Sequence, residues 1–175
     1  MNRRNTLNLS AIAALGFALS LSNAVAQQKQ HVSFKTPAEN TKYTQQQAID
    51  VGDVPGHQVR VYEIHRTYPN NAPVINGVKL VESWSRGITD YIDGNGPNTT
   101  YNIYILENGD KFSTRAALVA QSLGSGKITT TSAGSITSGT GKLAGIQGII
   151  RTTGTAEPKA GVNENMTEID YSIEK

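Results

Sequence analysis

Alternation of apolar and polar residues is the feature that most constrains the fold of this chain. From about residue 46 onward, β-branched and aromatic residues alternate with polar ones in segments bounded by Gly, Pro, Asn and Asp. No window carries the apolar stripe with a period of 3.6 residues that an amphipathic helix requires. The chain is therefore predicted to be all-β.

The alternating segments predict eight strands. The strongest turn signal is "YILENGDKFS", in which Asn108-Gly109 is typical of a two-residue type I′ hairpin. An even number of strands linked by hairpins closes into a barrel without exposed edges, so we expect an eight-stranded antiparallel up-and-down β-barrel. The predicted strands span residues 46–52, 57–67, 78–92, 99–107, 110–119, 126–138, 143–156 and 165–174.

Residues 1–26 have the pattern of a secretory signal peptide. Arg3 and Arg4 precede the apolar run "LSAIAALGFALSLS", and Ala24-Val25-Ala26 supplies small residues for cleavage. The apolar run is shorter than the roughly 20 residues that span a bilayer. We therefore expect a secreted or periplasmic protein without membrane contact after cleavage.

The residues after the signal peptide divide into two parts. Residues 27–45, "QQKQHVSFKTPAENTKYTQ", are polar, lack sustained periodicity and include Pro37, which predicts a flexible arm. Residues 46–175 are predicted to form the single barrel domain, since a chain of this length builds one core.

Charge and cysteine content exclude several classes of function. Residues 27–175 carry 14 basic and 14 acidic side chains, so no nucleic-acid-binding surface is expected. The absence of cysteine excludes disulfides, thiol nucleophiles and thiolate metal sites. His31, His57 and His65 do not have the spacing of a zinc site, so we expect neither a metal nor another cofactor.

Glycines recur within "GSITSGTGKLAGIQGIIRTTG", residues 134–154. The segment lacks the strand, glycine-rich turn and helix of a phosphate loop, and Leu143 stands where such a loop has Ser or Thr. It also contains too many Ile and Leu residues for a linker. Glycines within strands mark bends and close backbone approach, which a small barrel requires.

The stretch "SITSGTGKLAGIQGII" resembles the signature of the allene oxide cyclase and dirigent barrel superfamily. The resemblance is specific across residues 134–148, where Gly139, Gly141, Gly145 and Gly148 match as structural glycines. It implies an eight-stranded antiparallel barrel with a central, largely apolar cavity, in a family whose members are often trimeric, so a homo-oligomer is one expected assembly. It carries over no catalytic residue, because the cysteine of plant cyclase pockets has no counterpart here.

Alternation also selects the candidate site residues. In residues 57–67, one face carries Glu63 and His65 and the other carries Arg66, and the sequence leaves open which face is internal. In residues 78–92, the face with Glu82 is expected to line the cavity. The candidates for acid–base catalysis are Glu63, Glu82 and His65, and those for ligand binding are Trp84, Arg86, Tyr101 and Tyr104. The alternative is that the charged residues form outward-facing cross-strand pairs.

Three functions fit this sequence. The preferred hypothesis is a barrel that binds a small, mainly apolar molecule without turnover, because no complete catalytic constellation is present. A structural barrel acting through its surface or as an oligomer is the second. The third is a cofactor-free isomerase, a cyclase or dirigent-like guide of a reactive intermediate, with Glu63 or Glu82 as acid or base and Arg86 as anion clamp.

Overall fold

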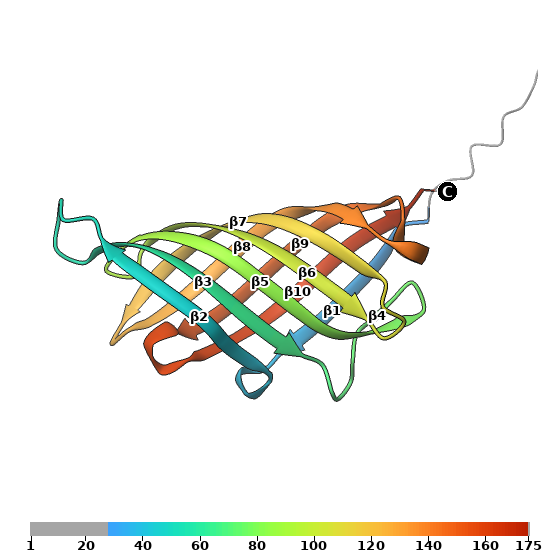
Figure 1. Cartoon of the computed structure of the whole chain (residues 1–175), viewed down its shortest axis with the longest axis horizontal. Coiled ribbons are helices and arrows are strands. Elements are labelled where there is room, and N and C mark those ends of the chain that lie inside the picture. The colour runs from blue at the N-terminus through green and yellow to red at the C-terminus, as the bar shows by residue number, and fades with distance from the viewer. Residues whose placement is uncertain (1–27, 175) are drawn as a thin grey trace, which may run out of the picture.

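The computed structural model describes residues 28–174, which form ten β-strands, three short 3-10 helices and no α-helix (Figure 1). The strands are β1 (Gln30–Thr36), β2 (Thr41–Asp50), β3 (His57–Thr67), β4 (Val74–Ile75), β5 (Val78–Ile92), β6 (Gly96–Leu106), β7 (Lys111–Gly124), β8 (Lys127–Gly139), β9 (Ile146–Glu157) and β10 (Val162–Ile173). The 3-10 helices are η1 (Ala38–Asn40), η2 (Gly141–Leu143) and η3 (Pro158–Ala160). None of the helices in this range is long and apolar enough to cross a membrane. The expected signal peptide lies outside the described residues.

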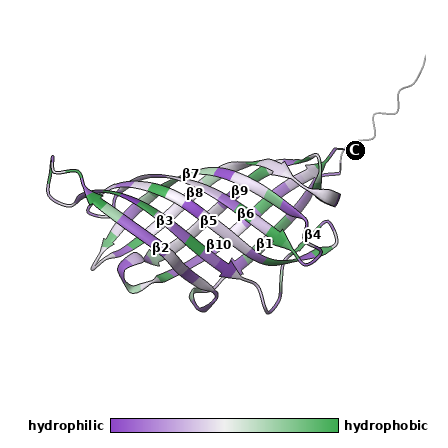
Figure 2. Cartoon of the chain, in the orientation of Figure 1, coloured by the Kyte–Doolittle hydropathy of each residue, from purple (hydrophilic) through white to green (hydrophobic). Residues whose placement is uncertain are grey.

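The all-β, antiparallel prediction is confirmed. Nine strands form one hydrogen-bonded path in the order β1-β10-β9-β8-β7-β6-β5-β3-β2, and β4 pairs only with β5. The sheet runs in a front and a back layer in Figure 1, with polar and apolar residues alternating along the strands in Figure 2. The expected closed, eight-stranded pairing is not found, because the sheet has ten strands and no ladder joins the edge strands β1 and β2.

The expected flexible arm is wrong for residues 30–45, which form β1 and the first half of β2. β1 pairs with β10 along its whole length, from Gln30 opposite Tyr171 to Thr36 opposite Asn165. Its inward residues Phe34 and Thr36 are buried. Only a few inward positions precede Pro37, too few for the alternation to stand out in the polar sequence around it.

β1 and β2 behave as two halves of one edge strand. Eight successive antiparallel pairings separate them in the sheet, so they run in the same direction, and only Pro37 and η1 stand between them in the chain. The first half pairs with β10 and the second half pairs with β3. One interrupted segment therefore forms both edges of the sheet.

The hairpin at Asn108-Gly109 is confirmed, but its predicted turn type is wrong. Only Gly109 has positive φ, and its N–H donates to the carbonyl of Leu106 at 2.9 Å. This is the arrangement of a type I turn followed by a glycine bulge. The two-residue turns with both φ positive lie elsewhere, at Asn76-Gly77, Asp93-Gly94 and Ser125-Gly126.

Two apolar clusters occupy the two ends of the interior. The larger one includes Ile75, Leu80, Leu106 and Leu143, each no more than 1% exposed. The smaller one, at the other ends of the same strands, consists of Tyr91, Ala120, Ile128 and Ala156. The inward residues between the clusters are mostly polar, so the middle of the interior is not an apolar core. These buried polar residues include Arg66, Ser83, Ser85, Asn102 and Thr114.

The segment between β8 and β9 closes the larger cluster. η2 inserts Leu143, which is fully buried, and Lys142 donates its backbone N–H to Asp110 at 3.1 Å. A Cβ on Gly139 would collide with the carbonyl oxygen of Leu143, so the chain needs glycine at this crossing. The glycine-rich stretch therefore serves close packing at one end of the sheet.

Replacing Leu143 by alanine is expected to lower the free energy of unfolding by about 2–5 kcal/mol, because the lost side chain leaves a cavity in the larger cluster. The matched control is Leu123→Ala, since Leu123 is 58% exposed and its loss is expected to change stability by no more than about 0.5 kcal/mol. Urea unfolding of both variants measures the difference. Equal losses would show that η2 does not seal the interior.

Candidate functional site

The inward and outward faces of β5 exchange at a β-bulge. The pairing with β6 passes from Leu80 opposite Leu106 to Glu82 opposite Ile105, which leaves Val81 as the extra residue. Leu80 points inward, but after the bulge Ser83 is the next buried residue. The expectation that Glu82, Trp84 and Arg86 line the interior is therefore wrong, because one additional residue moves every later side chain to the other face. These three side chains lie on the outer face, and the later inward positions are Ser85, Gly87, Thr89 and Tyr91.

The predicted residues nevertheless come together, on the outer surface of β3 and β5. His65 and Trp84 are opposite each other in the two strands, and their rings stack with centroids 4.2 Å apart. The Nε2 atom of His65 lies 2.7 Å from Oε2 of Glu82. The guanidinium of Arg86 covers the indole of Trp84 at 5.6 Å. These residues form outward-facing cross-strand contacts, which was the alternative interpretation of the sequence.

Glu63 belongs to the same outer cluster. Its carboxylate is 2.7 Å from the guanidinium of Arg86 and accepts a hydrogen bond of 2.7 Å from the hydroxyl of Thr44. The hydrogen bond from Thr44, followed by the attraction of Arg86, lowers the pKa of Glu63. A carboxylate held in its ionised form in this way is a poor proton donor at neutral pH.

The two tyrosines expected to bind ligand lie on opposite sides of the sheet. Tyr101 is 51% exposed on the outer face, where Arg115 covers its ring at 5.6 Å. Tyr104 is buried in the interior and stacks on Phe112 with centroids 4.6 Å apart. The four glycines singled out in the sequence lie at the end of β8, in the segment with η2 that follows it, and in β9, and the first of them is opposite Phe112. They are Gly139, Gly141, Gly145 and Gly148.

A cavity of about 80 Å³ lies inside the sheet, between the two apolar clusters. Hydroxyl and amide groups from six of the strands line it, with tyrosine rings and a few aliphatic side chains between them. This lining differs from the largely apolar cavity that the family resemblance implies. The polar residues that line it include Ser85, Asn98, Thr100, Asn102 and Asn163.

Arg66 is the most unusual residue of this lining. It is only 8% exposed, and it donates hydrogen bonds to the hydroxyl of Ser85 at 2.7 Å and to Oδ1 of Asn163 at 3.0 Å. The Ser85 hydroxyl donates in turn to Asn102 at 2.6 Å, and Asn102 donates to Thr114 at 3.0 Å. These contacts fix the guanidinium within a network of neutral partners.

A second cavity of about 440 Å³ lies at the end of the sheet that carries the smaller apolar cluster. The turns at 93–94 and 124–126 surround it, together with η3. It shares Arg60, Tyr91 and Ile128 with the inner cavity. The second cavity therefore forms a mouth, and these three side chains separate the mouth from the inner cavity.

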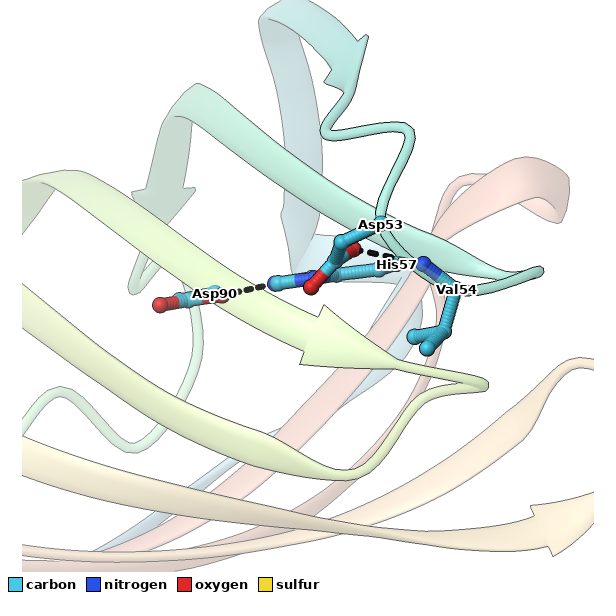
Figure 3. A network of polar contacts seen from close by, with 4 residues as sticks. All are labelled: Asp53, Val54, His57 and Asp90. Atoms are coloured by element: carbon cyan, nitrogen blue, oxygen red, sulfur yellow. Dashed lines mark hydrogen bonds and ion pairs between the residues drawn. The ribbon is translucent and has the colours of Figure 1, made fainter.

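His57 fastens the loop between β2 and β3 beside this mouth. Figure 3 shows its ring between two carboxylates, with Nδ1 2.6 Å from Asp53 and Nε2 2.7 Å from Asp90. The interaction with Asp90, followed by that with Asp53, raises the pKa of His57. The contact with His57, followed by the backbone N–H of Val54, lowers the pKa of Asp53. Protonated His57 therefore holds the loop against β5.

Tyr104 lines the inner cavity as predicted, but the other interior residues were missed because the choice between the two faces of β3 depends on tertiary structure. The inward face is the one with Arg60, Tyr62 and Arg66, which alternation alone does not distinguish from the other face.

Within residues 28–174, no group of three or more His, Cys, Asp or Glu residues is placed to hold a metal ion. No protein-family model matches the chain, and no curated protein matches it.

The stabilisation from His57 is expected to fall as pH rises. Its pKa is raised in the folded state, so the contribution is complete below the unfolded value of 6.5 and disappears as pH passes the folded pKa. The free energy of unfolding of the native protein is expected to exceed that of His57→Gln most below about pH 6.5, and the difference should shrink as pH rises from there into the alkaline range. Denaturant titrations across this range measure it. A constant difference would exclude a charged clamp.

Proposed function

We propose that this protein is a secreted or periplasmic β-barrel that binds a small molecule in its interior. The barrel has eight strand positions when β1 and β2 are taken as one interrupted strand and β4 is left outside the path. The resemblance of residues 134–148 to the allene oxide cyclase and dirigent superfamily agrees with this architecture. Some members of that superfamily are cyclases or stereochemical guides for reactive small molecules, and many bacterial members have no assigned activity.

The observation that carries the proposal is the polar cavity between the two apolar clusters. A barrel of eight strands is only just wide enough to be filled by its own side chains. Here the inward positions of β5 at the middle of the interior are small, namely Ser83, Ser85 and Gly87, and a cavity of about 80 Å³ remains. The larger cavity at the mouth adjoins it.

The lining favours a ligand that forms hydrogen bonds over a mainly apolar one. Asn98 and Asn102 present amides, and Thr100 presents a hydroxyl, from neighbouring inward positions of β6. Buried polar groups bind ligands that pair with them and discriminate against those that leave them unpaired. The ligand is therefore a small molecule with several polar atoms.

Binding without turnover is the preferred form of this proposal. The isomerase hypothesis assigned acid–base work to Glu63 or Glu82. Both carboxylates lie on the outer face, where Glu63 forms an ion pair with Arg86 and Glu82 forms a hydrogen bond with His65. The inner cavity is lined by no Asp, Glu or His side chain of the described residues. No observation in the interior favours proton transfer over binding.

Titration with acetamide, a small neutral probe, tests binding in the interior. In spectra of the ¹⁵N-labelled protein, the side-chain amides of Asn98 and Asn102 are expected to shift, whereas that of Asn108 in the exposed turn is not. Native mass spectrometry of the protein from its own compartment is expected to show a retained small molecule.

The variant Trp84→Ala provides the outer-face control. Because Trp84 contacts His65 and Arg86 on the outer surface, its removal is expected to leave the acetamide shifts unchanged. Shifts that are confined to the outer cluster, or that disappear in this variant, would move the binding site to the surface. The proposal would be overturned if acetamide caused no amide shifts and native mass spectrometry showed no retained molecule.

A further inference from the structure

The inner cavity contains two positive charges and no negative one. Arg60 and Arg66 both line it, and its lining includes no Asp, Glu, Lys or His among residues 28–174. Neither guanidinium lies within 4.0 Å of a carboxylate in this part of the chain. Arg60 instead donates to the amide oxygen of Gln46 at 3.0 Å.

Tyr91 and Tyr104, two tyrosines of the lining, do not neutralise this charge. Burial raises the pKa of Tyr91 to about 12 and raises the pKa of Tyr104 as well. Both phenols therefore keep their protons at neutral pH. The interior remains positively charged, and burial of an ion without an ionic partner is unfavourable. A charge kept at such a cost is typical of a binding site.

Building on the proposed function, we infer that the interior binds a small oxyanion, either a free inorganic anion or the carboxylate of an organic molecule, with Arg66 as its anchor. A guanidinium presents five N–H donors in a planar fork that matches the oxygens of such groups. The hydrogen bonds to Ser85 and Asn163 use two of these donors and orient the fork.

The neighbouring groups suit the same ligand. Asn98 and Thr100 line the cavity and carry donors as well as acceptors, so they adapt to an oxyanion without a competing fixed charge. A cavity of about 80 Å³ accommodates a group of the size of acetate or nitrate. The rest of a larger organic ligand would extend toward the mouth.

Arg60 lies on the route between the mouth and Arg66. It lines both cavities, and it precedes Arg66 by three inward positions on β3, or about 20 Å of strand. Besides Arg60, the mouth holds one charge of each sign, Asp93 and Lys159, which offset each other. The positive potential therefore increases from the mouth toward the interior, and it attracts anions.

Acetate and acetamide, which have the same shape and differ in charge, test the inference. At constant ionic strength, acetate is expected to shift the side-chain amide of Asn102 with at least about tenfold higher affinity than acetamide. Arg66→Gln is expected to remove this preference, and Arg66→Lys to retain part of it. Arg115→Gln removes an outer arginine and is expected to leave the preference unchanged. Thermal unfolding provides a second measurement, because acetate should raise the melting temperature of the native protein more than acetamide does.

Competition by nitrate and sulfate identifies the source of the oxyanion. If nitrate and sulfate displace acetate at similar concentrations, the site binds free inorganic anions. If they do not displace it, the site binds an organic carboxylate. Both results support the inference. Equal affinities for acetate and acetamide would overturn it while leaving interior binding intact. If Arg66→Gln does not fold, Arg60→Gln replaces it, with a smaller loss of the preference for acetate expected. An unchanged preference in the folded variants would also overturn the inference.

Discussion

The interior of this protein depends on the pairing of one segment, residues 30–50, with both ends of the sheet. Unpaired strand edges expose backbone donors and acceptors, and a curved sheet avoids this when its two edges meet. Here a single interrupted strand supplies both edges of the sheet, and its halves pair with β10 and β3. β2 and β10 are joined across the remaining gap by side chains, as in the 3.3 Å contact from Asn163 to the hydroxyl of Tyr43.

This construction concentrates polar groups at the middle of the structure. The apolar side chains that stabilise the fold gather at the two ends, where Leu143 and Ile75 close one side and Ile128 occupies the other. The residues between them, among them Arg66 and Asn102, are buried and satisfied by one another. Apolar packing and the buried polar network therefore occupy different levels of the same strands.

Local sequence signals predicted the strands well and the faces poorly. β3 and β5 have the predicted bounds, since long alternating segments limited by turn residues carry a strong signal. β1 was missed because its alternation is short, and the turn at Asn108 differs from its prediction because the following residues form a bulge. The outward placement of Glu82 and Trp84 depends on the extra residue Val81, whose position is set by pairing with β6 and not by the segment itself.

The bulge at Val81 also decides what chemistry the interior offers. Without it, alternation from Leu80 would carry the bulky side chains of Glu82, Trp84 and Arg86 inward. With it, Ser83 and Ser85 face inward, and their small side chains leave a cavity beside Arg66, which has no ionic partner within residues 28–174. The extra residue Val81 therefore places small side chains beside a buried arginine, while Glu63 and Glu82 make their contacts on the outer face.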